Sequence, residues 1–170
     1  MRGELDFTGS LHARVALLAG LDVVALRRAL HRVRYTDGAA ELMSTLRAAG
    51  HVTGIVSGGF TFFTERFAAE LGVDHAVANQ LEITDDRLTG RVTGPIIDRR
   101  RKAELLREIA DEEGIPMDRT VAVGDGANDL DMINTAGLGI AFCAKPALRQ
   151  EADVAIDEPD LRQVLPLLGL

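Results

Sequence analysis

From Tyr35 onward, short stretches of strand character alternate with longer stretches of helical character, and this alternation constrains the fold more than any other feature. The helical patterns cover residues 39–49, 60–71, 100–113, 128–136 and 161–168, and the strand patterns cover residues 52–56, 76–79, 120–123, 138–142 and 154–156. Such alternation predicts an α/β fold with a parallel sheet covered by helices on both faces. Because connections between parallel strands are right-handed, the carboxyl ends of the strands should meet at one edge, where such sheets bind ligands.

Two segments depart from this alternation. Residues 10–34 contain only helical patterns, interrupted at Gly20, which predicts two helices joined by a short turn. Residues 81–84 and 88–92 flank Asp85-Asp86-Arg87 and predict a β-hairpin, either a flap near a site or an edge ribbon.

The bulk composition excludes several classes of protein. A chain of 170 residues is long enough for one packed core, and no apolar run reaches the roughly 18 residues of a membrane span. The first residues lack the apolar stretch of a secretory signal, and a single cysteine allows no disulfide framework, so we expect a cytoplasmic protein. We expect Cys143 to be a small buried residue and the four histidines, which lack metal-binding spacing, to lie at the surface or to pack within the N-terminal helical section: His12, His31, His51 and His75.

The charges are unevenly distributed along the chain. The net charge is −7, from 19 basic and 26 acidic residues, which disfavours a nucleic-acid partner. Residues 1–35 contain six arginines and three acidic residues, so this section is net +3 and the remainder is net −10. A basic section beside an acidic body can attract a small anion, and an ordinary solvated arginine face would give the same pattern.

The most polar strand end is the segment VAVGDGANDLDM. A strand pattern runs directly into Asp125, and Asp129 follows four residues later near the start of the next helix. Mg²⁺ takes one or two protein carboxylates, keeps several waters and accepts a phosphate oxygen. We therefore predict that Asp125 binds Mg²⁺, that Asp129 binds the ion or orients one of its waters, and that Asn128 fixes their neighbours. Capping of the helix would explain one carboxylate of this segment, but the segment contains more than one.

A second strand pattern, residues 52–56, ends in Ser57-Gly58-Gly59. A serine hydroxyl and backbone amides at the start of a helix can hold phosphate oxygens. A serine that caps an ordinary strand-to-helix turn would have the same sequence, so this segment alone leaves both interpretations open.

A run of four cations, from Arg99 to Lys102, begins the helical pattern of residues 100–113. Positive charges at the start of a helix oppose its dipole, so local helix energetics do not require them there. We predict that Lys102 turns inward toward a phosphate and that Arg99, Arg100 and Arg101 form a solvated patch.

The segments VSGGF, RRRKAELL and VGDGANDLDM resemble, in order and spacing, the second, third and fourth motifs of the haloacid dehalogenase superfamily. Together with GELDFTGSLHARVALLAGL and GIAFCAKP they are most similar to its phosphoserine phosphatases, over nearly the whole chain. The resemblance implies a Rossmann-like parallel sheet with a small helical cap, residues 1–35 being the remainder of the cap and residues 36–170 the core. It also implies a Mg²⁺-dependent phosphomonoester hydrolase of serine biosynthesis, which releases L-serine and phosphate from O-phospho-L-serine through a phosphoaspartyl intermediate.

Residue by residue, the resemblance implies how the substrate is held. Ser57 and Lys102 would hold the phosphoryl group, and Gly58 would contribute its backbone amide. Arg14 would pair with the substrate carboxylate through its guanidinium fork, and Phe7 would close over the substrate.

For the metal, the resemblance implies Asp125 as a ligand, with Asn128 and Asp129 in support. The superfamily's first motif, D-x-D-x-T, supplies the aspartate nucleophile and the acid/base aspartate, and the 170 residues do not contain it. Because covalent phosphoryl transfer needs that carboxylate, we expect this chain alone to be inactive. The strand that bears the motif lies in the centre of the family's sheet, so we expect unpaired backbone groups between the strands that precede Ser57 and Asp125.

Three explanations of the missing motif stay open. The sequence starts at an internal methionine of an ordinary gene, or it is a fragment completed by another segment, or it is a decayed and non-catalytic relative. Two alternative functions stay open as well: a pseudo-phosphatase that only binds Mg²⁺ and a phosphate ester, and a phosphatase for another small phosphomonoester. The expected partner is in each case a small molecule, with neither nucleic acid nor membrane involved.

Overall fold

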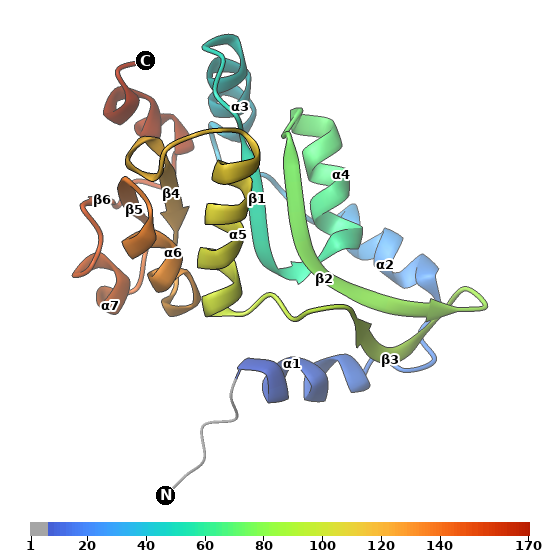
Figure 1. Cartoon of the computed structure of the whole chain (residues 1–170). Helices are drawn as coiled ribbons and strands as arrows, with labels where there is room; N and C mark the ends of the chain where they lie inside the picture. The colour runs from blue at the N-terminus through green and yellow to red at the C-terminus, as the bar shows by residue number, and fades with distance from the viewer. Residues whose placement is uncertain (1–6) are drawn as a thin grey trace, which may run out of the picture.

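A computed structural model of the chain describes residues 7–170 (Figure 1). The α-helices are α1 (Phe7–Ala16), α2 (Val23–Leu30), α3 (Ala39–Ala48), α4 (Thr61–Leu71), α5 (Arg99–Glu112), α6 (Leu130–Thr135) and α7 (Pro146–Arg149). The strands are β1 (Gly54–Phe60), β2 (His75–Thr84), β3 (Arg87–Thr93), β4 (Val121–Gly124), β5 (Leu138–Phe142) and β6 (Val154–Ile156). The 3₁₀ segments are η1 (Met117–Arg119), η2 (Ala127–Asp129) and η3 (Leu161–Leu168). Within these residues no helix has both the length and the apolar character needed to cross a membrane.

The strands form two separate sheets of three strands each. The first has the order β1-β2-β3, with β1 parallel and β3 antiparallel to β2, and the second is the parallel sheet β4-β5-β6. Over residues 7–170, β1 and β4 each pair on one side only. In the view of Figure 1 both strands run in the same direction, with β4 to the left of α5 and β1 to its right. The expectation of unpaired strand edges between the two halves is therefore confirmed.

The open edges also lower the burial of the two strands that carry them. None of the seven residues of β1 is buried, and in β4 only Ala122 is buried. In β5, by contrast, the three central residues are all buried. Strands of parallel sheets are ordinarily buried on both faces, so β1 and β4 have the burial of edge strands although they face each other across the fold.

Helices α5 and α3 both pack against the second sheet, and α5 also contacts the first. Val56 of β1 and Leu106 of α5 pack against a buried cluster of the second sheet that includes Ala122 and Ala141. On α3, Leu42 belongs to a buried cluster with three residues of β5, β6 and η3: Ile140, Ile156 and Val164. The apolar packing of α5 therefore connects the two sheets, since within the described residues no backbone pairing joins them, while α3 covers the second sheet.

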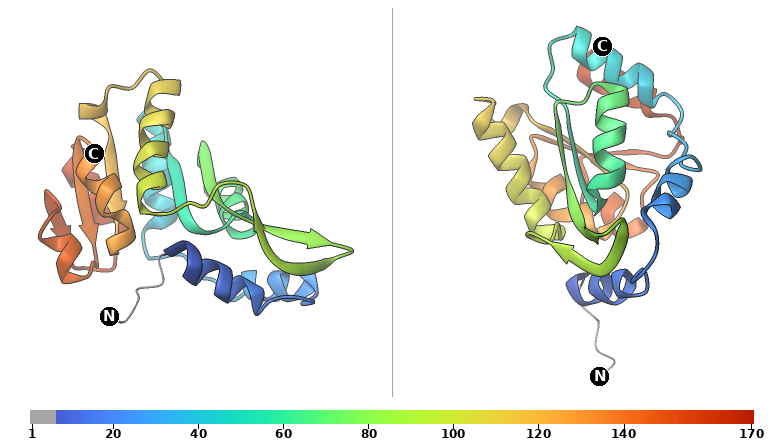
Figure 2. Two further views of the ribbon diagram at one scale, coloured as in Figure 1. Left: turned by 60° about the horizontal axis from the view of Figure 1, so that its bottom comes forward. Right: turned by 90° about the vertical axis from the view of Figure 1, so that its right-hand side faces the viewer.

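The first two helices pack against the β2–β3 hairpin (Figure 2). Their shared cluster consists of Leu11, Val15, Leu26, Leu81 and Leu88. The backbone amide of Gly20, in the turn between α1 and α2, donates to the carbonyl of Leu88. Gly90 of β3 has a φ of +83°, and a Cβ there would lie 2.8 Å from the Cβ of Ala19, so this position requires glycine. The predicted pair of helices and the predicted hairpin are thus confirmed, and they form one packed unit.

Some predicted boundaries were wrong. Ser57-Gly58-Gly59 was predicted as a turn, but β1 continues through it to Phe60 with an irregular register. Residues 76–79 and 81–84 were predicted as separate strands, and they form the single strand β2. The helical pattern of residues 128–136 begins as the 3₁₀ segment η2, and α6 ends at Thr135. The short helix α7 was not predicted.

Candidate functional site

The first part of the site is the bulged end of β1. Ser57 is in register with Ala78 and Phe60 with Asn79, so Gly58 and Gly59 have no partner residue in β2. The amide of Gly59 donates to Ser57 Oγ at 3.0 Å, which leaves the proton of the hydroxyl available to a ligand. Because α4 begins at Thr61, the bulge lies beside a helix start, an environment that favours anions.

The second part of the site is Lys102, in the first turn of α5. The helix is capped by Asp98, whose carboxylate accepts from the amide of Arg101 at 2.8 Å. Lys102 is 5% exposed, so the prediction that this member of the cationic run turns inward is confirmed. Lysine is almost never buried this deeply without a charged partner.

The three arginines of the run have acidic partners outside the site. Arg99 pairs with Asp131 at 2.5 Å, and Arg100 pairs with Glu104 at 2.8 Å. Arg101 pairs with Glu108 at 2.5 Å. The hydrogen bond from Arg100 lowers the pKa of the Glu104 carboxyl. These partners compensate the arginines on the surface, so Lys102 is the one member of the run whose charge enters the site.

Asp129 is the partner of the buried lysine. Lys102 Nζ donates to Asp129 Oδ1 at 2.6 Å, and Asp129 is 4% exposed. Its other oxygen, Oδ2, accepts from the amides of Asp125 at 3.1 Å and Gly126 at 3.2 Å. Both oxygens therefore have protein donors, and this arrangement offsets the desolvation of a buried ion pair. It supports an orienting role for Asp129, while direct binding of a metal by Asp129 stays a prediction.

Two glycines make room for this arrangement. A Cβ on Gly124 would lie 2.5 Å from the Cβ of Asp129, and a Cβ on Gly126 would lie 2.6 Å from Asn128 Oδ1. Real Cβ atoms do not approach so closely, so glycines at the end of β4 let the Asp129 carboxylate reach the strand end and let the Asn128 side chain lie over Gly126.

Asp125 provides the free carboxylate. Its backbone carbonyl accepts from the amide of Lys145 at 3.2 Å, while its exposed side chain has no hydrogen-bond or ion-pair partner among residues 7–170. No cluster of three or more histidine, cysteine or acidic side chains that could hold a metal occurs within the same residues. One free carboxylate beside a strand end fits Mg²⁺, which keeps several waters and takes few protein ligands, better than an ion that needs a complete protein cage.

A residue that the sequence reasoning missed connects the two parts of the site. Asn79 of β2 is fully buried, and its Nδ2 donates to the carbonyl of Gly58 at 2.9 Å. Its Oδ1 accepts from the amide of Ile97 at 2.8 Å, just before α5 begins. The sequence has two adjacent amides here, Asn79 and Gln80, and other polar residues in the same strand, so it gave no signal that singled out Asn79.

Phe7 contacts the site from α1, and Arg14 lies further along the same helix. The ring of Phe7 lies against the backbone of Gly58, since a Cβ on that glycine would be 3.0 Å from Phe7 Cζ. Arg14 lies seven residues further along α1, about 10 Å along the axis and on the same side of the helix. It is exposed, and its Nε donates to the carbonyl of Ser10 at 3.4 Å without any acidic partner among the described residues. Phe7 thus contacts the bulge, and Arg14 is left free to take an anion.

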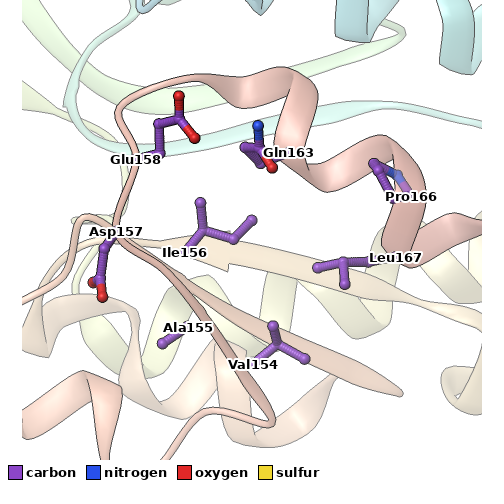
Figure 3. A pocket seen from close by; sticks show the side chains of 8 residues that line it. All are labelled: Val154, Ala155, Ile156, Asp157, Glu158, Gln163, Pro166 and Leu167. Carbon is purple, nitrogen blue, oxygen red and sulfur yellow. The ribbon is translucent and has the colours of Figure 1, made fainter.

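Other features lie away from these residues. A cavity of about 350 Å³ is lined by β6 and η3, and the side chains around it come from Val154, Ala155, Ile156, Asp157, Glu158, Gln163, Pro166 and Leu167 (Figure 3). None of the predicted site residues lines it. The Cys143 prediction was wrong: this residue is exposed because β5 ends at Phe142. His12, His31 and His51 lie at the surface as expected, whereas His75 is partly buried at the start of β2, outside residues 1–35, and bonds through Nε2 to Glu113 Oε1 at 2.7 Å.

The sequence pattern of the haloacid dehalogenase-like hydrolases matches residues 1–134. The chain belongs to this family. Within it, the phosphoserine phosphatase of Streptomyces coelicolor is 58% identical over 170 residues, and that of Streptococcus thermophilus is 47% identical over 168 residues. The chain therefore falls among the phosphoserine phosphatases, as the sequence resemblance indicated.

Solved phosphoserine phosphatases also share the fold. A substrate-bound phosphoserine phosphatase is 45% identical and superposes with a TM-score of 0.92 over 98% of this chain and 80% of that one. A probable phosphoserine phosphatase from Vibrio cholerae, without ligand, is 39% identical and superposes with a TM-score of 0.95 over 99% of this chain and 52% of that one. The predicted fold class, an α/β fold of the haloacid dehalogenase type, is thus confirmed.

The relatives of the chain are longer than the region that it matches. The chain spans 42% of the Streptomyces coelicolor protein and 78% of the Streptococcus thermophilus protein. Each relative therefore contains polypeptide for which these 170 residues have no counterpart. The division into a cap of residues 1–35 and a core of residues 36–170 stays a prediction.

Proposed function

We propose that the protein of which this chain is part hydrolyses O-phospho-L-serine to L-serine and phosphate, with Mg²⁺ as its cofactor. The observation that carries the proposal is the burial of the Lys102 ammonium group beside Asp129, at the helix start next to the Ser57 bulge. Burying an ion pair costs desolvation free energy and is weak evidence for a stabilising role, so a binding role explains the pair better.

The residues of this chain would bind and orient the phosphoryl group. The Ser57 hydroxyl and the Gly58 amide would donate to its oxygens, and the Lys102 ammonium group would neutralise part of its charge. Asp129 would hold Lys102 and, through its two amide contacts, the loop that carries Asp125. Asp125, with Asn128 beside it, would hold Mg²⁺, and the bound ion would neutralise charge on the phosphoryl oxygens.

The attacking carboxylate is not among these 170 residues. In the proposed reaction an aspartate oxygen bonds to phosphorus while the bond from phosphorus to the serine oxygen breaks, and that oxygen takes a proton as L-serine leaves. Water then hydrolyses the aspartyl phosphate. The open edges of β1 and β4 support this proposal, since a strand between them would carry its last residue to the ends of both neighbours, beside Ser57 and Asp125.

Arg14 would recognise the amino-acid part of the substrate. A guanidinium group donates to both oxygens of a carboxylate, and Arg14 has no competing acidic partner within the described residues. Phe7, against Gly58, would close the site between Arg14 and the phosphate.

The test is an assay of phosphate release from phosphoserine with Mg²⁺, made with the full-length protein. Arg14→Ala should lower kcat/KM for phosphoserine about 10- to 100-fold, the equivalent of a lost hydrogen bond to a charged group. The same variant should leave the hydrolysis of phosphoethanolamine, which lacks the carboxylate, unchanged. Arg28→Ala on α2, also exposed, is the control of equal charge and should affect neither ester.

A folded full-length protein that releases no phosphate from phosphoserine would refute the proposal. Equal effects of Arg14→Ala on both esters would favour another small phosphomonoester as the substrate. The pseudo-phosphatase alternative predicts calorimetric binding of phosphoserine by this 170-residue chain without turnover, and a chain that is unfolded on its own would rule it out.

A further inference from the structure

We infer that Asn79 is a positioning residue of the phosphate site, which fixes the Ser57–Gly58 bulge relative to the start of α5. The inference rests on the proposed function and extends it to a residue that makes no contact with the expected ligands. Asn79 lies on β2, one strand away from the bulge, and connects two backbone groups that belong to different elements.

The contacts of Asn79 use the two ends of its amide in opposite senses. Nδ2 donates to the carbonyl of Gly58 at 2.9 Å, and Oδ1 accepts from the amide of Ile97 at 2.8 Å. A carbonyl can only accept and an amide N–H can only donate, so the orientation of the side chain is fixed by its partners. Asn79 is fully buried, and Ile97 is 2% exposed.

These contacts are costly to lose. Gly58 lies in the bulge, where β2 offers it no partner residue, and its carbonyl is instead bonded to Asn79. An apolar residue at position 79 would leave this carbonyl and the Ile97 amide buried without partners, at about 1–3 kcal/mol for each group. An apolar side chain would otherwise suit this buried strand position, so the asparagine is explained by its two partners.

The link determines the geometry of the phosphate site. Ile97 is followed by Asp98, the cap of α5, and Lys102 lies in the first turn of that helix. A contact that holds Ile97 at a fixed distance from Gly58 therefore holds the lysine at a fixed distance from the serine hydroxyl. Groups that donate to one phosphate act together only when each is held at the right distance from it. Displacing either the Ser57–Gly58 bulge or Lys102 should therefore weaken phosphate binding.

The test uses Asn79→Asp in the full-length protein. Aspartate keeps the shape and the acceptor for Ile97 but replaces the donor to Gly58 with an oxygen that repels its carbonyl. We expect the KM for phosphoserine and the dissociation constant of inorganic phosphate to rise about ten-fold or more, as for one lost buried hydrogen bond. Asn79→Ser, which is too short to reach both partners and adds no charge, should give the same direction of change and serves if the aspartate variant does not fold.

Thr120→Val is the matched control. Thr120 is also buried, and its hydroxyl also makes two hydrogen bonds: it donates to the carbonyl of Met117 at 2.7 Å and accepts from the amide of Gly137 at 3.1 Å. These contacts lie before β4, at the opposite end of that strand from Asp125. We expect a similar loss of thermal stability but less than a two-fold change in KM and in phosphate affinity.

A positioning role is refuted if Asn79→Asp and Asn79→Ser both lower the thermal stability and neither of them changes phosphate affinity. Inorganic phosphate separates this result from a failure of the proposed function. If the wild-type protein binds phosphate but does not hydrolyse phosphoserine, the proposed function is wrong, and weaker phosphate binding by Asn79→Asp still supports the inference. If the wild-type protein binds no phosphate, both are wrong.

Discussion

Removing the charges of Lys102 and Asp129 singly and together should show how strongly the buried pair is coupled. Their 2.6 Å contact is almost fully withdrawn from water, with 6% of each side chain exposed. Removal of one partner leaves the other charge buried and uncompensated, which costs about 3–5 kcal/mol. We therefore expect Lys102→Met and Asp129→Asn each to lower the free energy of unfolding by about that amount.

The double variant should lose much less than the sum of the two. Asparagine at position 129 can still accept from the amides of Asp125 and Gly126. The double variant therefore loses the ion pair but keeps these two contacts with the loop after β4. The expected coupling energy is about 2–4 kcal/mol, because the cost of leaving one charge unpaired disappears when both charges are removed.

Urea unfolding at constant pH measures the free energy of unfolding of the wild type, the two single variants and the double variant. Equal slopes of this free energy against urea concentration would show that the unfolded states are comparable. The control is the same cycle on Arg100 and Glu104, a pair at 2.8 Å on α5 whose side chains are 85% and 36% exposed. Its coupling energy should be close to zero, because exposed ion pairs on a helix contribute little. If the Lys102–Asp129 coupling is no larger than this control, the two side chains do not depend on each other and the argument for a charged, buried phosphate site is refuted.

Two further predictions concern other contacts of the structure. Gly124→Ala should lower the free energy of unfolding by about 1–3 kcal/mol, because the new Cβ would lie 2.5 Å from the Cβ of Asp129. The control is Gly54→Ala in β1, where the new Cβ would lie 3.8 Å from the nearest atom, and it should change the free energy of unfolding by less than about 0.5 kcal/mol. Equal effects of the two substitutions would contradict the close approach at Gly124. At Asp74, hydrogen bonds from the backbone amide and then the hydroxyl of Thr53 lower the pKa of the carboxyl below its ordinary 3.8. The ionised carboxylate therefore stabilises the folded protein above pH 3.8, and this stabilisation is lost as the pH falls through the lower pKa of the folded state. The difference in unfolding free energy between the wild type and Asp74→Asn should therefore be largest near neutral pH and disappear in acid, and a difference independent of pH would refute this cause.

Features set by local sequence could be predicted. Helix and strand positions followed from apolar periodicity, and the bounds of β5 and β6 are those expected. The inward turn of Lys102 could also be predicted, because cations at a helix start are unfavourable locally and needed another reason. The acidic partners of Arg100 and Arg101 lie four and seven residues away on α5, at helical spacing.

Features set by distant contacts could not be predicted. The partner of Lys102 lies 27 residues away, and the two partners of Asn79 lie 18 and 21 residues away. Nothing in the sequence near Asn79 distinguishes a bridging amide from an exposed polar residue of an edge strand. The extension of β1 through Ser57-Gly58-Gly59 was missed for a related reason, since glycines usually end a strand, whereas here they form a bulge.

The dependence of the site on α5 follows from these contacts. The start of α5 is tied to the first sheet by the bond from Ile97 to Asn79, and its first turn is tied to the second sheet by the bond from Lys102 to Asp129. No strand pairing joins β1 to β4 within the described residues, so side-chain contacts alone set the distance between Ser57 and Asp125. Side-chain links are softer than a ladder of backbone hydrogen bonds. A strand inserted between β1 and β4 would replace them with backbone pairing on both sides, so phosphate should bind more tightly to the full-length protein than to these 170 residues alone.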